Sequence, residues 1–173
     1  MNMKNKNFYM QKALQQAKVA LKKEEVPVGA VIIDKNGVII ARAYNKIEAA
    51  QCHQAHAEVL AIKKACKKVK NWRLNGCWLV VTLEPCLMCL GLIQLSRLEG
   101  IIYGAPSTLF GSGLWCKSND AHPPYARHLK IEGHVKEKEC VELLKTFFSD
   151  KRKKRKVNSE AKSRISQENK KSS

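Results

Sequence analysis

The sequence predicts an α/β protein in which one β-sheet lies between two layers of helices, a three-layer α/β/α sandwich. Two observations carry this prediction. Segments with helical spacing of apolar residues alternate along the chain with strand-like segments, in the order helix, hairpin, helix, strand, helix, strand. In addition, residues 77–83 form a continuous apolar run with two adjacent valines, which is typical of a central strand buried on both faces.

The N-terminal part predicts a helix followed by a hairpin. Over residues 7–23 the apolar residues recur at helical spacing, with Lys and Gln on the opposite face. Residues 28–33 predict a buried strand, residues 38–44 its return strand, and an Asn-Gly pair between them is the dipeptide that tight hairpin turns prefer. The other predicted elements are a loop at 46–53, a helix at 55–70, a connector at 71–76, a helix at 86–96 and a short strand at 101–104.

Length and charge indicate one globular domain with a basic extension. The 173 residues include 32 Lys and Arg against 15 Asp and Glu, which gives a net charge of +17. We expect one folded domain over residues 1–150 and a basic, partly disordered tail over residues 151–173. Such an excess of positive charge predicts a polyanionic partner, and nucleic acid fits better than a membrane. A generally basic proteome is the alternative explanation.

Apolar runs and cysteine usage bear on the compartment. No apolar run approaches the roughly 20 residues that a membrane-spanning helix needs, and the N-terminus lacks the apolar centre of a signal peptide. The seven cysteines are odd in number and mostly scattered, which argues against a disulfide framework. These features predict a soluble, cytoplasmic protein without membrane association. We expect Cys66, Cys77 and Cys140 to be core residues.

Two short segments contain the side chains of a zinc site. His56 begins a helical pattern, and Cys86 and Cys89 are three residues apart, so their thiols share one face of a helix. Pro85 suits the first turn of that helix, whose dipole favours thiolates at the N-terminus. Three protein ligands leave a fourth position for water, as in catalytic zinc sites. Glu58 then needs no ligand role and is suited to moving protons.

Other interpretations of these residues stay open. A lone C-x-x-C motif also occurs in redox-active, structural-zinc and core positions, so a disulfide or a structural metal site is the alternative to a catalytic one. Cys52 and His53 lie just before His56 and offer two further ligands in principle.

His56-Ala57-Glu58 and Pro85-Cys86-Leu87-Met88-Cys89 together resemble the H-x-E and P-C-x-x-C signature of the zinc-dependent nucleoside and nucleobase deaminases. Over about residues 7–150 the chain resembles the tRNA adenosine deaminases of this superfamily. The segments that carry this likeness are E-V-P-V-G-A-V at 25–31, T-L-E-P-C-L-M-C at 82–89, Gly91, Ser96-Arg97, and the stretch from Glu139 to Phe148.

This resemblance implies a fold, a cofactor and a reaction. The fold would be the cytidine-deaminase-like sandwich with a five-stranded mixed sheet. One Zn²⁺ per subunit would be held by His56, Cys86 and Cys89, and family members are homodimers. The reaction would be hydrolysis of adenosine to inosine at the wobble position, 34, of a tRNA anticodon. Glu58 would take a proton from a zinc-activated water and deliver it to N1 of adenine and then to the departing amine.

The resemblance also implies substrate contacts. Asn45 matches an asparagine whose amide hydrogen-bonds the nucleoside, although a plain turn residue is the alternative. Val28, Ala57 and Phe148 are the other expected contacts, with Phe148 near the anticodon loop and core packing as its alternative role. By fold analogy, the backbone N–H of Glu84 or of a neighbour would help to hold the exocyclic amine.

One segment departs from the family's pattern. After Tyr103-Gly104-Ala105 these deaminases carry an acidic residue, a lysine and a glycine-rich stretch that helps to hold the RNA. Here residues 106–114 have Ser107 in place of the acidic residue and contain no lysine, and Leu92 replaces a small residue after Gly91. These changes leave the zinc ligands untouched and concern how the nucleotides that flank the target base are bound.

The basic tail favours a nucleic-acid substrate. We expect its first cations to contact phosphates and add salt-dependent affinity, although a tail that serves only solubility is the alternative. These cations are Lys151, Arg152, Lys153, Lys154 and Arg155. Two further functions stay open: a deaminase of free guanine or cytosine compounds, and a non-catalytic RNA-binding subunit that keeps the zinc fold. The presence of Glu58 argues against the latter, because a structural zinc site does not need that residue.

Overall fold

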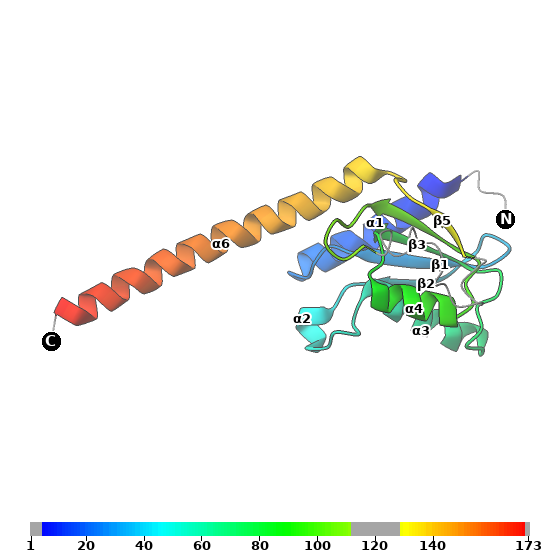
Figure 1. The fold of residues 1–173 in the computed structure, drawn as a ribbon, viewed down its shortest axis with the longest axis horizontal. Coiled ribbons are helices and arrows are strands. Elements are labelled where there is room, and N and C mark those ends of the chain that lie inside the picture. Colours follow the sequence, from blue (N-terminus) through cyan, green and yellow to red (C-terminus); the bar gives the residue numbers. More distant parts are fainter. Residues whose placement is uncertain (1–4, 112–128, 172–173) are drawn as a thin grey trace.

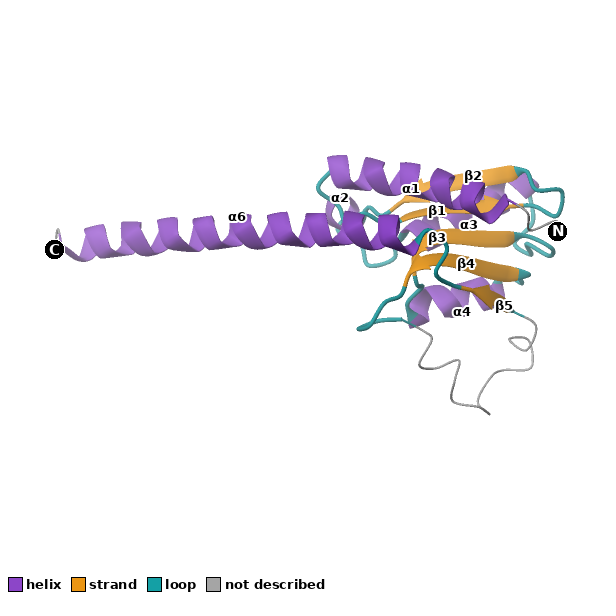
Figure 2. Cartoon of the chain, turned by 90° about the horizontal axis from the view of Figure 1, so that it is seen from above, coloured by secondary structure: helices purple, strands orange, loops and turns teal. Residues whose placement is uncertain are grey.

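The structure, a computed structural model, describes residues 5–111 and 129–171. Cys116 and residues 112–114 of the segment that departs from the family's pattern lie outside these ranges. Within the described ranges, five strands form one mixed sheet in the order β2-β1-β3-β4-β5 (Figure 2). The strands are β1 (Gly29–Ile33), β2 (Ile39–Tyr44), β3 (Trp78–Leu83), β4 (Gly100–Ala105) and β5 (Lys130–Glu132).

The directions of the strands explain why the sheet is mixed. β1 is antiparallel to both β2 and β3, because the hairpin returns the chain at once. β4 is parallel to both β3 and β5. At the hairpin turn, Asp34 Oδ1 accepts the N–H groups of Asn36 at 2.9 Å and Val38 at 2.8 Å, and Gly37 takes a φ of +83°. The predicted hairpin and the five-stranded mixed sheet are therefore confirmed.

Helices cover both faces of the sheet, which confirms the three-layer sandwich (Figure 1). α1 (Lys6–Lys22) and the first part of α6 (Glu137–Lys171) lie over one face, and α3 (Ala57–Val69) and α4 (Leu87–Leu95) lie over the other. The side chains of β1 alternate between the two layers. Ala30 and Ile32 belong to the core under α3 and α4, whereas Val31 and Ile33 belong to the core under α1.

Helix α1 packs directly on the start of β1 at Gly29. A Cβ atom there would lie 2.2 Å from the backbone oxygen of Ala13 and 2.4 Å from the backbone nitrogen of Ala17. Glycine therefore lets the helix and the strand approach this closely. This contact between α1 and Gly29 holds in place the segment between α1 and β1, which includes Val28.

Two helices differ from the sequence prediction. The predicted loop at 46–53 contains a short helix, α2 (Ile47–Ala50), which a distant carboxylate stabilises as described below. α6 continues to Lys171, whereas the composition of residues 151–173 predicts a partly disordered tail. Residues 151–171 lack Gly and Pro and are rich in Lys, Arg, Glu and Gln, which favour a helix. Figure 1 shows this part of α6 extending away from the sheet. The division into a domain and a tail stays a prediction.

The apolar helix α4 is only partly covered. Cys89, Leu90 and Ile93 are buried, but Leu87 and Leu95 are 47% and 59% exposed. This helix is therefore not deeply buried within one chain. The six cysteines within the described ranges are all free, and Cys77 and Cys140 are buried as expected while Cys66 is half-buried. In the part of the chain that the structure describes, no helix is long and apolar enough to cross a membrane.

Candidate active site

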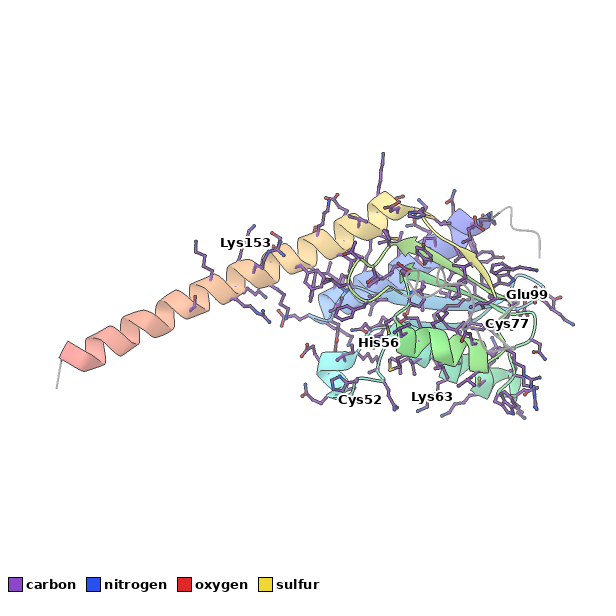
Figure 3. The ribbon with its side chains drawn as sticks, in the orientation of Figure 1. Cys52, His56, Lys63, Cys77, Glu99 and Lys153 are labelled. Atoms are coloured by element: carbon purple, nitrogen blue, oxygen red, sulfur yellow. The ribbon has the colours of Figure 1, made fainter. Side chains whose placement is uncertain are left out.

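A pocket of about 650 Å³ opens where β3 and β4 end and where α3 and α4 begin. Its volume is typical of small-molecule sites, which often lie beyond the carboxyl ends of sheet strands. Figure 3 shows His56 at this end of the sheet, whereas Cys77 and Glu99 lie at the opposite end. The pocket brings together most of the predicted site residues, namely Val28, Asn45, His56, Glu58, Cys86 and Phe148.

The two predicted ligand segments meet in this pocket. His56 Nδ1 lies 3.5 Å from Cys89 Sγ and 3.9 Å from Cys86 Sγ, and the three ligand atoms lie within 4.8 Å of one another. Tetrahedral zinc with bonds of about 2.0–2.3 Å places nitrogen and sulfur ligands about 3.6 Å apart. One imidazole and two thiolates therefore fit a single zinc ion here. Among the described residues, this ligand group includes neither Cys52, which is exposed, nor His53.

Both ligand segments begin helices. His56 is the N-cap residue of α3 and Cys86 is the N-cap residue of α4, one position before the helices that carry them. Their carbonyl oxygens accept the first helical bonds, from the N–H groups of Leu60 at 3.0 Å and Leu90 at 2.8 Å. The positive ends of two helix dipoles therefore face the thiols and favour negative charge on sulfur.

The thiols and the imidazole are coupled to one another. A hydrogen bond from Cys89 and another with His56 lower the pKa of Cys86 to about 4. The bond with Cys86 and burial raise the pKa of Cys89, since its proton is shared with the neighbouring sulfur. The bond with Cys86 also raises the pKa of His56. A thiolate therefore forms readily in this cluster, and thiolate is the form that binds a metal.

Glu58 lies in the first turn of α3 and is only 4% exposed. Burial raises its pKa above that of an ordinary glutamate, while the nearby imidazole of His56 acts in the opposite direction. Its side chain also hydrogen-bonds with Cys89, next to the ligand cluster. A buried carboxyl group beside a metal site, with its pKa raised, is suited to accept and return a proton.

The four expected substrate contacts occupy different places. Asn45 is 4% exposed and Val28 is 7% exposed, and both line the pocket. Phe148 also lines it, with 44% of its surface exposed, whereas its neighbour Phe147 is buried. Ala57 is fully buried in the core and does not line the pocket. The substrate role of each residue stays a prediction.

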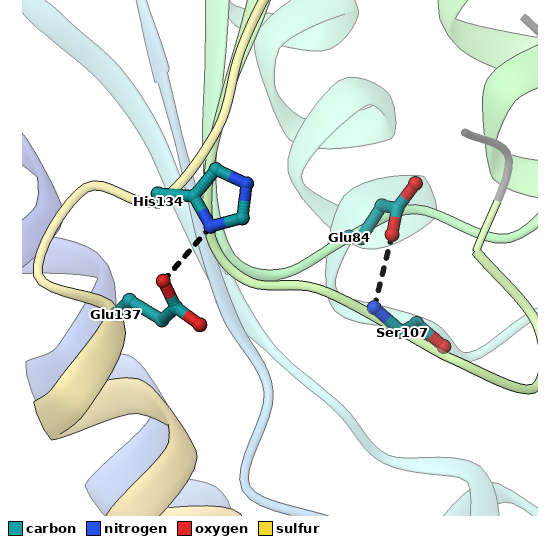
Figure 4. Close-up of polar contacts among 4 residues, drawn as sticks. All are labelled: Glu84, Ser107, His134 and Glu137. Carbon is teal, nitrogen blue, oxygen red and sulfur yellow. Dashed lines mark hydrogen bonds and ion pairs between the residues drawn. The ribbon is translucent and has the colours of Figure 1, made fainter. Parts of the chain in front are cut away.

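One rim of the pocket is the loop after β4, which includes Ser107. Glu84 Oε2 accepts the backbone N–H of Ser107 at 2.9 Å (Figure 4). Ser107 in turn accepts the N–H of Phe110 on its Oγ at 3.3 Å and the N–H of Gly111 on its carbonyl at 3.0 Å. This network presents the exposed side chains of Leu109 and Phe110 at the pocket. Figure 4 also shows the contact between His134 and Glu137 at the start of α6, where Nδ1 and Oε2 lie 2.8 Å apart.

The backbone N–H of Glu84 is not available to a substrate. It donates to the carbonyl oxygen of Ala105 at 2.8 Å and thereby extends the pairing of β3 with β4. The suggestion that this N–H holds the exocyclic amine is therefore wrong for Glu84 itself. The sequence analysis missed its carboxylate, which anchors the rim, and the buried carboxylate of Glu25. No local pattern indicates either role, because the partners lie about 20 residues away in the sequence.

The predicted phosphate-binding cations begin the exposed part of α6. Lys151 Nζ lies 5.5 Å from the centre of the Phe147 ring, and Lys154 pairs with exposed Glu24 at 2.7 Å. Arg152, Lys153 and Arg155 have exposed side chains, and Figure 3 shows Lys153 on α6 beyond the sheet. The positive charge therefore starts within one turn of Phe148 at the pocket mouth.

Comparisons with known proteins agree with this geometry. A family model described as the cytidine and deoxycytidylate deaminase zinc-binding region matches residues 3–105. A tRNA-specific adenosine deaminase of Bacillus subtilis is 43% identical over 87% of this chain and 92% of its own length. The Aquifex aeolicus protein of the same name is 42% identical over 83% of this chain and 93% of its own length. A structure from a study of A-to-I editing by tRNA:A34 deaminases superposes with a TM-score of 0.70 at 33% identity, over 79% of this chain and 99% of that one. A Bacillus subtilis guanine deaminase superposes with a TM-score of 0.58 at 34% identity, over 68% of this chain and 78% of that one.

Proposed function

Because the chain belongs to the cytidine and deoxycytidylate deaminase family, we propose that it hydrolyses adenosine to inosine at the wobble position of a tRNA anticodon. The observation that carries the proposal is the meeting of His56, Cys86 and Cys89 with the buried Glu58 in one pocket. The choice of tRNA adenosine over other deaminase substrates is supported by relatives of that name, which match nearly the whole chain.

Each residue of the cluster has a defined task in this proposal. His56 Nδ1 and the sulfur atoms of Cys86 and Cys89 would hold one Zn²⁺. When bound, zinc supplies a Lewis acid that lowers the pKa of water. Glu58 takes a proton from the water whose oxygen attacks C6 of adenine, and it delivers a proton to N1. It then takes the proton of the new C6 hydroxyl and passes it to the amino group, which leaves as ammonia while the C6 carbonyl forms.

The pocket accepts one base that has left its stack. A loop releases a base at lower cost than a duplex does, which favours an anticodon as the substrate. Asn45 would hydrogen-bond the nucleoside through its amide, with Val28 and Ala57 beside it. Phe148 would stack near a neighbouring nucleotide, since aromatic side chains commonly support unpaired bases. The cations that begin with Lys151 would bind phosphates next to this entrance.

We further propose that the protein acts as a homodimer in the cytoplasm. An apolar groove between α3 and α4 supports an interface between subunits, because exposed apolar surface of this kind marks association sites. The groove is lined by Val59, Ile62, Lys63, Cys66, Trp72, Leu92, Leu95 and Ser96. A cytoplasmic location agrees with a tRNA substrate and with seven cysteines that form no disulfide pattern.

The alternative functions have less support. A deaminase of free guanine would not need the cations of α6. The tRNA-specific adenosine deaminases of Bacillus subtilis and Aquifex aeolicus, at 43% and 42% identity, are also more similar in sequence to this chain than the Bacillus subtilis guanine deaminase, at 34%. A non-catalytic RNA-binding subunit would not need a buried carboxyl group beside its metal ligands.

A substrate comparison tests the proposal. The purified chain, with its zinc content measured, is incubated with an anticodon stem-loop that has adenosine at position 34. A matched stem-loop has the adenosine moved one position along the loop. We expect inosine in the first RNA alone. Ammonia release from free guanine or cytosine, with none from either RNA, would contradict the proposal.

A further inference from the structure

We propose that Glu25 is a positioning residue that turns the amide of Asn45, so that Asn45 presents its carbonyl oxygen to the substrate. This inference rests on the function proposed above. It concerns a carboxylate that is 1% exposed and does not itself line the pocket. The pocket wall then offers a hydrogen-bond acceptor and selects a nucleoside group that donates, such as a hydroxyl or an N–H.

Three N–H groups converge on the Glu25 carboxylate. Oε1 accepts the backbone N–H of Ala49 at 2.7 Å, and Oε2 accepts the backbone N–H of Glu48 at 3.2 Å. Oε2 also accepts the side-chain N–H of Asn45 at 3.4 Å. A buried carboxylate is costly unless such donors surround it, so these contacts explain how Glu25 remains in the interior.

The chemistry of the carboxylate determines how the amide is oriented. An asparagine amide has a donating end and an accepting end of nearly the same shape, whereas an ionised carboxylate only accepts. Nδ2 of Asn45 therefore faces Glu25, and Oδ1 faces away from it. The backbone of Asn45 is held by its N–H bond to Val28 O at 3.0 Å, and the next N–H, of Lys46, donates to Ala55 O at 2.9 Å. With the backbone held, the side-chain amide of Asn45 can still rotate, and its bond to Glu25 prevents that rotation.

The same carboxylate supports a second part of the pocket. Glu48 and Ala49 lie in α2, and the neighbouring Ile47 lines the pocket with Asn45. A purely structural role for Glu25 in stabilising α2 would therefore also affect the pocket. The test has to separate this role from control of the Asn45 amide.

Glu25→Gln separates the two roles. A glutamine keeps the size of the side chain and the acceptor for the N–H of Ala49. Its NH₂ takes the place of Oε2, where it can face Asn45 Oδ1 and permit the amide to turn, and the bond from the N–H of Glu48 is lost as well. We expect kcat/KM on the adenosine-34 stem-loop to fall by about 10- to 100-fold in Glu25→Gln and in Asn45→Ala. The double variant should be no worse than Asn45→Ala alone, because Glu25 acts through Asn45. Additive losses would overturn the proposal.

A spectroscopic measurement on the free, zinc-loaded protein needs no turnover. The side-chain amide signal of Asn45, identified by its loss in Asn45→Ala, should show one proton shifted downfield by the carboxylate. Glu25→Gln should remove that shift, whereas Glu142→Gln, which changes an exposed carboxylate on α6, should leave it. An unchanged Asn45 signal in Glu25→Gln would refute the positioning role. An intact signature in a wild-type protein that forms no inosine would instead refute the proposed function alone.

Discussion

Replacing Glu58 with glutamine should nearly abolish turnover while zinc binding stays intact. Glu58 is only 4% exposed, which limits the access of bulk water or buffer to the position from which it transfers protons. A single general acid–base contribution is worth about 10²- to 10⁴-fold in rate. At about 1.36 kcal/mol for each factor of ten, the activation barrier should rise by about 3–5 kcal/mol. The fold should tolerate the change, because burial raises the pKa of Glu58 and so already disfavours its charged form.

Single-turnover kinetics on the adenosine-34 stem-loop measure this effect, together with the zinc content of each preparation. Glu142→Gln is the matched control, because its carboxylate is exposed on α6 and lies outside the pocket. It should retain wild-type kcat and one zinc per chain. A Glu58→Gln protein with a kcat within tenfold of wild type would refute the proton-transfer role. A Glu58→Gln protein that loses its zinc would show that Glu58 is a ligand.

Three further changes test separate parts of the structure. Gly29→Ala should destabilise the fold by about 1–3 kcal/mol in chemical denaturation, because its methyl group would overlap the backbone of α1. Gly91→Ala is the control: its added Cβ atom would meet no neighbouring element within 4 Å, so stability should change by less than about 1 kcal/mol. Phe147→Ala should cost about 3–5 kcal/mol of stability, whereas Phe148→Ala should chiefly raise KM; equal loss of stability in both would contradict the stacking role. Removing residues 151–173 should weaken stem-loop binding and reduce its dependence on salt, and unchanged affinity at low salt would exclude phosphate contacts by the tail.

The sequence predicted the parts of the fold that local patterns determine. The hairpin has an Asn-Gly turn and apolar strands, and β3 is an uninterrupted apolar run, so both could be recognised without knowledge of their partners. The ligand cluster was also predictable, because His56 and Cys86 each precede a helix that begins at the same end of the sheet. Side chains at two helix N-termini that share one edge of the sheet lie close to one another.

The parts that were missed depend on contacts between distant segments. β5 has three residues, two of them exposed, so its pairing with β4 leaves no apolar pattern in the sequence. α2 is four residues long and has no sequence signal of its own, since Glu25 satisfies two of its N–H groups from across the chain. The full length of α6 was missed because a polar, charged composition predicts disorder even where many residues, such as Lys, Arg, Glu and Gln, favour a helix.

The most direct test of the central claim is deamination of the adenosine-34 stem-loop in water enriched in ¹⁸O. Hydrolysis in the pocket predicts that inosine appears at position 34 and that one ammonia is released for each base converted. Each inosine should contain one ¹⁸O and be about 2 Da heavier than inosine formed in ordinary water. Inosine without the label, or an unchanged adenosine in the presence of fully zinc-loaded protein, would contradict the account.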